Sequence, residues 1–233
     1  MNIAIVKYNA GNIYSVDYAL KRLGVDAIIT SDKETLMKAD KVIFPGVGEA
    51  ETTMNFLREQ KLDLLIKDLK QPVLGICLGM QIAVIEYARN VLGIGDANSG
   101  EFDELCKHKV IDFMPGQSDD IDKGGTLRLG AYPCNIKVGT TMERCYGSVN
   151  ISERHRHRYE FNNDYREAFE KAGLTLSGTS PDGRLIETVE LTERPFHVGV
   201  QYHPEFKSRP NKAHPLFIGF IGAAFERTTG GES

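Results

Sequence analysis

Short apolar runs alternate with amphipathic segments over the first ninety residues, and this alternation constrains the fold more than any other feature. The apolar runs, which we expect to form buried strands, cover residues 2–6, 25–30, 41–44 and 72–76. The segments expected to be helical cover residues 13–23, 33–38, 50–69 and 79–89. Strands and helices that alternate along a chain form a parallel sheet covered by helices on both faces. We therefore expect an α/β fold with a single doubly wound, mainly parallel sheet.

The second half of the chain replaces this alternation with short β-like pieces. They lie between residues 126 and 202, and helices are expected at 164–172 and 215–226. These pieces predict extra antiparallel strands in the same domain. The polar, glycine-rich stretch 118–125 is interpreted as a loop and not as a linker, so residues 1–233 are expected to form a single domain.

Composition argues against several classes of function. The chain has 233 residues, 41% of them hydrophobic, which is enough for a sizeable core, and its net charge of −4 gives no electrostatic reason to expect nucleic acid or a membrane as a partner. No apolar run approaches the roughly 20 residues that span a bilayer. Four cysteines without metal-ligand spacing are typical of reduced, intracellular thiols. We expect a soluble, cytoplasmic protein with no metal or other cofactor.

Gly75-Ile76-Cys77-Leu78-Gly79 has the glycine–x–nucleophile–x–glycine form of a nucleophile elbow, with cysteine as the nucleophile. A strand that turns sharply into a helix exposes the nucleophile, and side chains at the two glycine positions would collide there. The helix N-terminus favours a thiolate, and the N–H of Leu78 would face a developing oxyanion. A buried structural cysteine beside helix-packing glycines is an equal alternative for this pentapeptide alone.

A cysteine nucleophile needs a base, and His203 is the best candidate. It follows an apolar run and precedes Pro204 and Glu205, so that the imidazole would lie at the edge of the sheet. Glu205 could accept a hydrogen bond from the ring and fix its tautomer, which gives a Cys77–His203–Glu205 triad. The alternative for His203 alone is a surface turn residue, but its pairing with the elbow favours the triad.

His155 and His157 alternate with arginines in residues 154–158. Alternation predicts a strand with both histidines on one face and Arg154, Arg156 and Arg158 on the other. A metal site would need a third ligand, which the sequence does not indicate, so none is expected. One arginine of this segment could bind an anion.

The chain also carries a glycine loop, "FPGVG", at residues 44–48, directly after an expected strand. Glycines there allow backbone N–H groups to approach a ligand, although an ordinary tight turn is favoured for this motif alone.

Taken together, these three motifs in this order resemble the class I glutamine amidotransferases over nearly the whole chain. The resemblance implies a flavodoxin-like α/β fold. It also implies hydrolysis of L-glutamine through a γ-glutamyl thioester, with ammonia released to a synthase partner.

The resemblance further implies a role for each matching residue. Cys77 would be the nucleophile, and His203, oriented by Glu205, the general base and acid. The N–H groups of Leu78 and Val47 would form the oxyanion hole. The substrate would be held by the following residues: Gly46, Gly48, Gln81, Glu101, Arg158 and Tyr159.

Within the family, the two ends of the chain resemble different branches. Residues 1–80 resemble the glutaminase subunit of imidazole glycerol phosphate synthase, and residues 73–233 resemble the glutaminase domain of CTP synthase. The overlap at 73–81 predicts a chimera with its junction there. The implied partner is an ammonia-accepting synthase, either a cyclase barrel or a CTP synthetase domain.

Two other classes of function remain open. A recombined chain could be a folded but inactive binding or structural protein, because an error of about 1 Å in such a site costs about a hundredfold in rate. A cysteine protease or other thiol hydrolase is the third hypothesis, although Gln81, Glu101 and Arg158 suit a free amino acid better than a peptide.

Overall fold

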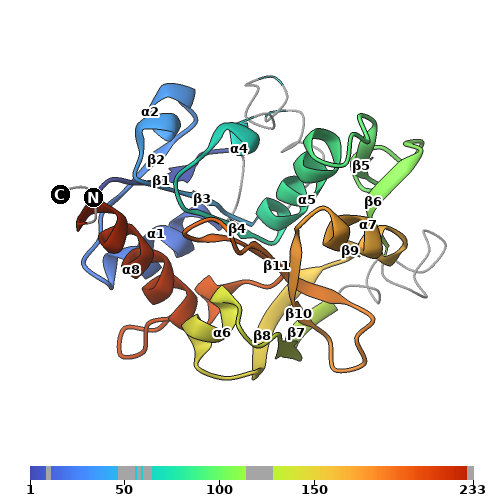
Figure 1. Ribbon diagram of the computed structural model, residues 1–233. Coiled ribbons are helices and arrows are strands. Elements are labelled where there is room, and N and C mark those ends of the chain that lie inside the picture. The colour runs from blue at the N-terminus through green and yellow to red at the C-terminus, as the bar shows by residue number, and fades with distance from the viewer. Residues whose placement is uncertain (9–11, 47–55, 57–58, 60–64, 114–127, 230–233) are drawn as a thin grey trace.

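Two sheets and their covering helices make up the structure, a computed structural model (Figure 1). It describes all residues except 9–11, 47–55, 57–58, 60–64, 114–127 and 230–233. The larger sheet has nine strands in the order β2-β1-β3-β4-β12-β11-β10-β7-β8, and the smaller sheet has three in the order β5-β6-β9. No helix among the described residues is long and apolar enough to cross a membrane.

Five strands of the large sheet run parallel, as the alternating pattern predicts. They are β1 (Ile3–Val6), β2 (Ala27–Thr30), β3 (Lys41–Phe44), β4 (Val73–Ile76) and β12 (His197–Val200). The first four come from the N-terminal third of the chain, whereas β12 arrives from near the C-terminus and pairs directly with β4. Strands β1, β3 and β4 are buried along their whole length, because helices cover both faces.

The remaining strands of the large sheet pair antiparallel and come from the second half of the chain, which confirms the expected extra strands. They are β7 (Arg128–Ile136), β8 (Asn150–His157), β10 (Thr175–Thr179) and β11 (Ile186–Leu191). The small sheet consists of β5 (Ala97–Ser99), β6 (His108–Phe113) and β9 (Tyr159–Phe161). The large sheet is therefore mixed, with parallel pairing from β2 to β12 and antiparallel pairing from β12 to β8.

Helices lie on both faces of the parallel strands (Figure 1). On one face, α1 (Ile13–Lys21) and α8 (Pro215–Thr229) share a core with Ile3 and Ile5 of β1. On the other, α2 (Lys33–Lys38) and α4 (Leu65–Asp68) share a core with Ala4 and Val6 of the same strand. Successive side chains of a strand point to opposite faces, so one apolar run fills both cores. The doubly wound α/β fold is thus confirmed.

The remaining helices are α5 (Leu78–Asn90), α6 (Thr141–Tyr146) and α7 (Arg166–Lys171), together with the 3₁₀ turns Asn163–Tyr165 and Pro204–Phe206. Of these, α6 packs into the same core as α8, whereas α5 packs into the core of the other face. Most of the expected helical segment 50–69 and the expected loop 118–125 lie outside the described residues. Where the structure describes them, the other expected helices are present with ends shifted by a few residues, as capping and fraying commonly produce.

Candidate active site

Strand β4 passes into helix α5 through Cys77, whose backbone has a rare conformation. Its φ of 50° and ψ of −106° lie outside the regions that L-residues ordinarily adopt. The Cys77 N–H donates to the carbonyl of Val200 at 2.7 Å, which ties the turn to β12. The Cys77 carbonyl accepts hydrogen bonds from the N–H groups of Met80 and Gln81, which begin the helix. The thiol therefore lies at the N-terminus of a 13-residue helix.

The two glycines of the elbow have the steric role that the sequence predicts. A Cβ atom at Gly75 would lie 2.8 Å from the backbone of Gly79, and one at Gly79 would lie 2.4 Å from the carbonyl oxygen of Phe44 in β3. Both contacts are with backbone, which has little freedom to move away. Only glycine fits at these two positions without displacing a strand or the helix.

His203 and Glu205 lie just beyond the end of β12, at the same edge of the sheet as Cys77. Because β12 pairs in parallel with β4, with Val200 opposite Ile76, the residues that follow the two strands emerge side by side. The Nδ1 atom of His203 lies 2.7 Å from Oε1 of Glu205, and both side chains are buried. The ring of His203 also stacks on Phe206.

The side chains of Cys77 and His203 both lie next to Gly46. A Cβ atom on Gly46 would lie 2.6 Å from Cε1 of His203 and 3.1 Å from Cβ of Cys77. The two side chains therefore border the same small volume, which a larger residue at Gly46 would fill. The Nδ1 atom of His203 is engaged by Glu205, so its buried Nε2 atom is the ring nitrogen left to exchange a proton with the thiol.

The electrostatic environment favours a charged His203. Burial opposes the charge, but the charge at Cys77 and the Glu205 carboxylate outweigh it and raise the pKa of His203 to about 10. At neutral pH the imidazole therefore holds its proton beside the sulfur. Such a pair is the environment in which a cysteine acts as a nucleophile.

Two buried glutamine side chains connect the elbow to β9. Nε2 of Gln81 donates to the carbonyl of Tyr159 at 3.0 Å and to Oε1 of Gln201 at 3.3 Å, and Nε2 of Gln201 lies 3.7 Å from the Cys77 sulfur. Gln81 and Tyr159 were expected at the site from the sequence, whereas Gln201 was not. Its adjacency to the His203 motif in the sequence is the signal that could have found it.

Glu101 and Arg158, which were expected to bind the two ends of an amino acid, interact electrostatically. Glu101 keeps exposed surface, yet desolvation by the surrounding protein raises its pKa to about 7, and the charge of Arg158 opposes this rise. Arg158 is half-buried, directly after β8. A neighbouring acidic and basic group suit a zwitterionic ligand.

The structure describes one of the two residues that the sequence predicts as oxyanion donors. Leu78 is the first residue of α5, so its N–H has no acceptor within the helix. Val47 and Gly48 lie outside the described residues. Two residues that the sequence did not indicate lie nearby: the hydroxyl of Tyr8 donates to the carbonyl of Pro45, and Nδ2 of Asn12 donates to Oε1 of Glu205 at 3.4 Å.

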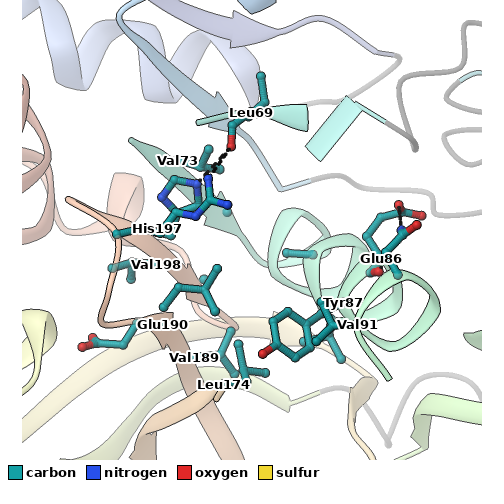
Figure 2. A pocket seen from close by; sticks show the side chains of 17 residues that line it. Leu69, Val73, Glu86, Tyr87, Val91, Leu174, Val189, Glu190, His197 and Val198 are labelled. Atoms are coloured by element: carbon teal, nitrogen blue, oxygen red, sulfur yellow. Dashed lines mark hydrogen bonds between the residues drawn. The ribbon is translucent and has the colours of Figure 1, made fainter. Parts of the chain in front are cut away.

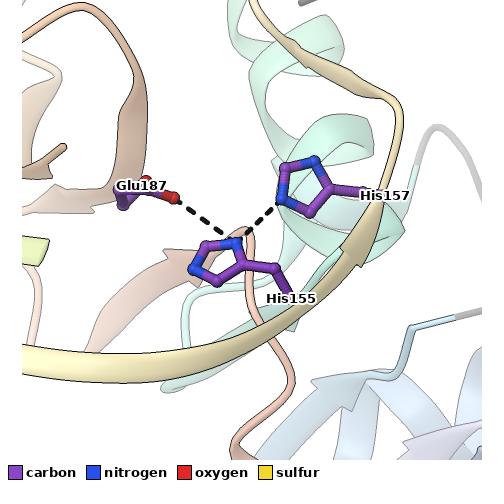
Figure 3. A group of neighbouring side chains, drawn as sticks. All are labelled: His155, His157 and Glu187. Atoms are coloured by element: carbon purple, nitrogen blue, oxygen red, sulfur yellow. Dashed lines mark hydrogen bonds and ion pairs between the residues drawn. The ribbon is translucent and has the colours of Figure 1, made fainter. Parts of the chain in front are cut away.

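His155 and His157 lie on the buried face of β8, and Arg154 and Arg156 are exposed on the other face, as alternation predicts. Arg158 lies beyond the end of the strand and is half-buried, so it does not continue this face. The structure adds a third group, because Glu187 of β11 lies beside the two rings (Figure 3). One ligand atom from each of the three side chains lies within 4.8 Å of the others. The sequence could not indicate Glu187, since its position depends on the order of strands in the sheet.

An apolar cavity of about 240 Å³ lies between α5 and the strands β4, β11 and β12 (Figure 2). It is lined by Val73 and Val198 at the beginnings of their strands, and by Tyr87 and Val91 of α5. Cys77 and His203 follow the other ends of β4 and β12. The cavity is therefore separate from the candidate active site.

The comparisons with known proteins agree with this geometry. Residues 4–223 match the model of the family described as "Glutamine amidotransferase class-I". The chain belongs to this family. A CTP synthase from Clostridium perfringens (strain SM101 / Type A) is 53% identical over 193 residues, which cover 82% of this amidotransferase chain and 35% of the relative. A CTP synthase from Lactobacillus delbrueckii subsp. bulgaricus is 47% identical over 225 residues, which cover 93% and 40% of the two chains. The chain thus spans well under half the length of these relatives.

Solved structures show the same relationship. The glutaminase domain of Trypanosoma brucei CTPS with bound acivicin superimposes with a TM-score of 0.84 at 33% identity, covering 97% of this chain and 94% of that domain. Another solved structure, described as a glutamine amidotransferase, has a TM-score of 0.59 at 17% identity, covering 95% of this chain and 98% of that one. At this low identity, the second likeness shows the fold alone.

Proposed function

We propose that this chain is a glutaminase that hydrolyses L-glutamine to glutamate and ammonia, with Cys77 as the nucleophile. The observation that carries the proposal is the meeting of Cys77, His203 and Glu205 at one edge of the sheet, in a chain that belongs to the class I glutamine amidotransferases. A buried structural cysteine would need none of these neighbours.

The proposed reaction has two halves. The sulfur of Cys77 attacks the γ-carbonyl carbon of glutamine, and the oxyanion that forms accepts hydrogen bonds from the N–H groups of Leu78 and Val47. The proton held by His203 passes to the leaving nitrogen, which departs as ammonia and leaves a γ-glutamyl thioester. His203 then takes a proton from water, which attacks the thioester and releases glutamate. Glu205 holds the imidazole in the required tautomer throughout.

Substrate recognition is assigned to the groups around the elbow. Glu101 would bind the α-ammonium group, and Arg158 with Tyr159 the α-carboxylate. Gln81 would hold the side-chain amide, and glycine at positions 46 and 48 would leave room for the ligand. The distance of 2.6 Å that a Cβ atom on Gly46 would have to His203 supports the need for glycine there.

We further propose that the ammonia passes to a CTP synthetase domain. The relatives described above are CTP synthases, and the chain matches only part of their length. This favours a CTP synthetase domain over a cyclase barrel as acceptor. The resemblance of residues 1–80 to the imidazole glycerol phosphate branch stays a prediction. The Lactobacillus alignment includes more residues than lie between 73 and the C-terminus, so the CTP synthase likeness extends across the expected junction.

Glutamate release from L-glutamine tests the proposal. The parent chain is expected to release glutamate and ammonia in equal amounts, and Cys77→Ala to release neither. Cys134→Ala is the matched control, because Cys134 is buried in β7, away from the elbow. This variant should release glutamate at a rate close to that of the parent. Equal rates for the parent and Cys77→Ala would refute the proposal. A folded parent without any release would favour the inactive binding protein instead.

A further inference from the structure

In the hydrogen bond between His155 and His157, the contacts of the two rings determine which ring is the donor. Nδ1 of His157 lies 3.3 Å from the carbonyl oxygen of Tyr159. A carbonyl oxygen only accepts, so this nitrogen carries a proton. Nε2 of His157 lies 2.8 Å from Nδ1 of His155. When His157 is neutral, its Nε2 atom carries no proton. Nδ1 of His155 therefore donates to Nε2 of His157.

Both rings are held neutral, which fixes this direction. Burial lowers the pKa of His155 to about 2 and the pKa of His157 to about 3, and the positive charge of Arg128 acts in the same sense. The opposite direction would require a doubly protonated His157. Among the described residues, the ionisable groups that face the pair are Arg128, Glu160, Glu187 and His203, and Tyr132 and Tyr202 pack against the ring of His155.

The carbonyl of Tyr159 joins this pair to the elbow. It accepts from Nδ1 of His157 and also from Nε2 of Gln81 at 3.0 Å. The second amide proton of Gln81 is directed at Oε1 of Gln201. With both amide protons engaged, the side chain of Gln81 can offer a ligand only its Oε1 atom. The orientation of this atom therefore depends on where the Tyr159 carbonyl points.

A metal site is the competing interpretation of His155, His157 and Glu187 (Figure 3). The guanidinium of Arg128, also buried, lies 2.6 Å from Oε1 of Glu187 and 3.8 Å from Oε1 of Glu160. This cation already neutralises the carboxylate that a metal would use, and it would repel a divalent ion. The 2.8 Å separation of the two ring nitrogens is that of a hydrogen bond. The geometry favours the hydrogen-bonded pair.

We propose that His155 and His157 form a hydrogen-bond relay that positions the Tyr159 carbonyl, and through it Gln81, for binding the amide of glutamine. This inference rests on the proposed glutaminase function. His157 is a positioning residue, since it acts through Tyr159 and not on the substrate. The relay would make the orientation of Gln81 depend on β8, whose Arg154 carbonyl also accepts from the backbone N–H of His203 at 2.9 Å.

Two substitutions of His157 separate the hydrogen bond from the bulk of the ring. His157→Asn keeps an N–H donor where Nδ1 stands, whereas His157→Phe keeps the ring and removes the donor. His157→Phe is expected to raise the KM for glutamine by roughly three- to tenfold, the worth of one hydrogen bond, with kcat within about twofold of the parent. His157→Asn is expected to stay within about twofold of the parent KM. The alkylation rate of Cys77 by iodoacetamide, which does not need Gln81, serves as the folding control.

An unchanged KM in His157→Phe would overturn the relay, and so would an equal rise in both variants, which would indicate a packing role. A second readout does not need activity. Two-bond ¹H–¹⁵N spectra of ¹⁵N-histidine protein, assigned with His157→Asn, should show His155 and His157 as neutral Nδ1–H tautomers between about pH 5 and pH 8. An Nε2–H tautomer or an imidazolium would contradict the proposal.

The same spectra decide between the relay and a metal site. One equivalent of ZnCl₂ should leave the signals of both histidines in place, whereas a stoichiometric shift of both would establish a metal site and overturn the relay. If the parent fails to hydrolyse glutamine while the predicted tautomers are present, the proposed function fails and the hydrogen-bond chain stands. The two failures are therefore distinguishable.

Discussion

At the scale of single residues, the candidate site combines a proton-holding imidazole with a carboxyl group poised to titrate. His203 keeps its proton through neutral pH because Cys77 and Glu205 outweigh the effect of burial on its pKa. Glu101 has the opposite character, since desolvation raises its pKa to about 7. The ionisation of the site at neutral pH is thus set more by Glu101 than by the histidine.

Glutamine binding should therefore depend on pH through Glu101. Above about pH 7 the Glu101 carboxylate is ionised and can pair with the α-ammonium group of glutamine. Below about pH 7 the carboxyl group is protonated and cannot form this pair. The KM for glutamine is expected to rise about tenfold between pH 8 and pH 6, as the ionised fraction falls. Steady-state kinetics across this range measure it. Glu101→Gln should have a high KM at every pH, and a parent KM that does not vary with pH would contradict the role of Glu101.

Most of the residues at the elbow could be predicted from the sequence, whereas those brought there by strands distant in the sequence could not. The motif around Cys77 specifies a local turn, so the steric need for glycine at the positions close to Cys77 can be predicted from the sequence. Gln201 contacts the sulfur because β12 lies beside β4, and Glu187 of β11 meets His155 of β8 although the two strands are not neighbours in the sheet. Strand order is a property of the whole sheet, and no local pattern carries it.

At the scale of elements, the contact of the elbow with β3 controls the position of the thiol. Gly79→Ala would place a methyl group 2.4 Å from the carbonyl oxygen of Phe44. We expect a loss of about 1–3 kcal/mol in the free energy of unfolding, since α5 or β3 must shift. Glutamine hydrolysis should fall by more than tenfold, because the shift moves Cys77 away from His203.

Gly95→Ala is the matched control for this variant. Nothing lies within 4 Å of a Cβ atom at Gly95, and its φ is not positive. Urea unfolding and the hydrolysis assay should therefore give values close to those of the parent. If Gly79→Ala is as stable and as active as Gly95→Ala, the close packing of the elbow on β3 is not what positions the thiol.

The parallel half of the fold was the more predictable half, for a physical reason. Strands such as β1 are buried on both faces, so they are continuous apolar runs that stand out from the amphipathic helices between them. In the second half, a strand such as β8 alternates buried and exposed residues, which the sequence identified at His155 and His157. The strand that pairs with β8 could not be predicted, because every half-buried antiparallel strand has the same alternation of buried and exposed residues.

At the scale of the whole molecule, buried titratable groups shape the dependence of stability on pH. His155 and His157 have lowered pKa values in the folded state, so the unfolded state binds more protons below about pH 6.5 and stability falls as the pH falls. Burial raises the pKa of Glu160 to about 8 and of Glu187 to about 7. The folded state therefore binds more protons above about pH 4.5, and these groups lower stability as the pH rises towards 8.

The two effects oppose each other between about pH 4.5 and 6.5, and stability is expected to be greatest there. Urea unfolding at pH 4, 5.5 and 8 should give the highest free energy of unfolding at the middle value. In His155→Phe the fall on the acid side should be shallower. A free energy of unfolding that rises steadily from pH 5.5 to pH 8 would contradict the protonation of the buried glutamates.

Reaction with 6-diazo-5-oxonorleucine, a reactive analogue of glutamine, tests the central claim most directly. Burial raises the pKa of Cys145 to about 11, and desolvation also raises the pKa values of Cys106 and Cys134, so these thiols are poor nucleophiles at neutral pH. Mass spectrometry of the intact chain and its peptides should find one adduct, on Cys77, which excess glutamine prevents. An adduct on another cysteine, or a folded chain that forms none, would contradict a glutamine site built around Cys77.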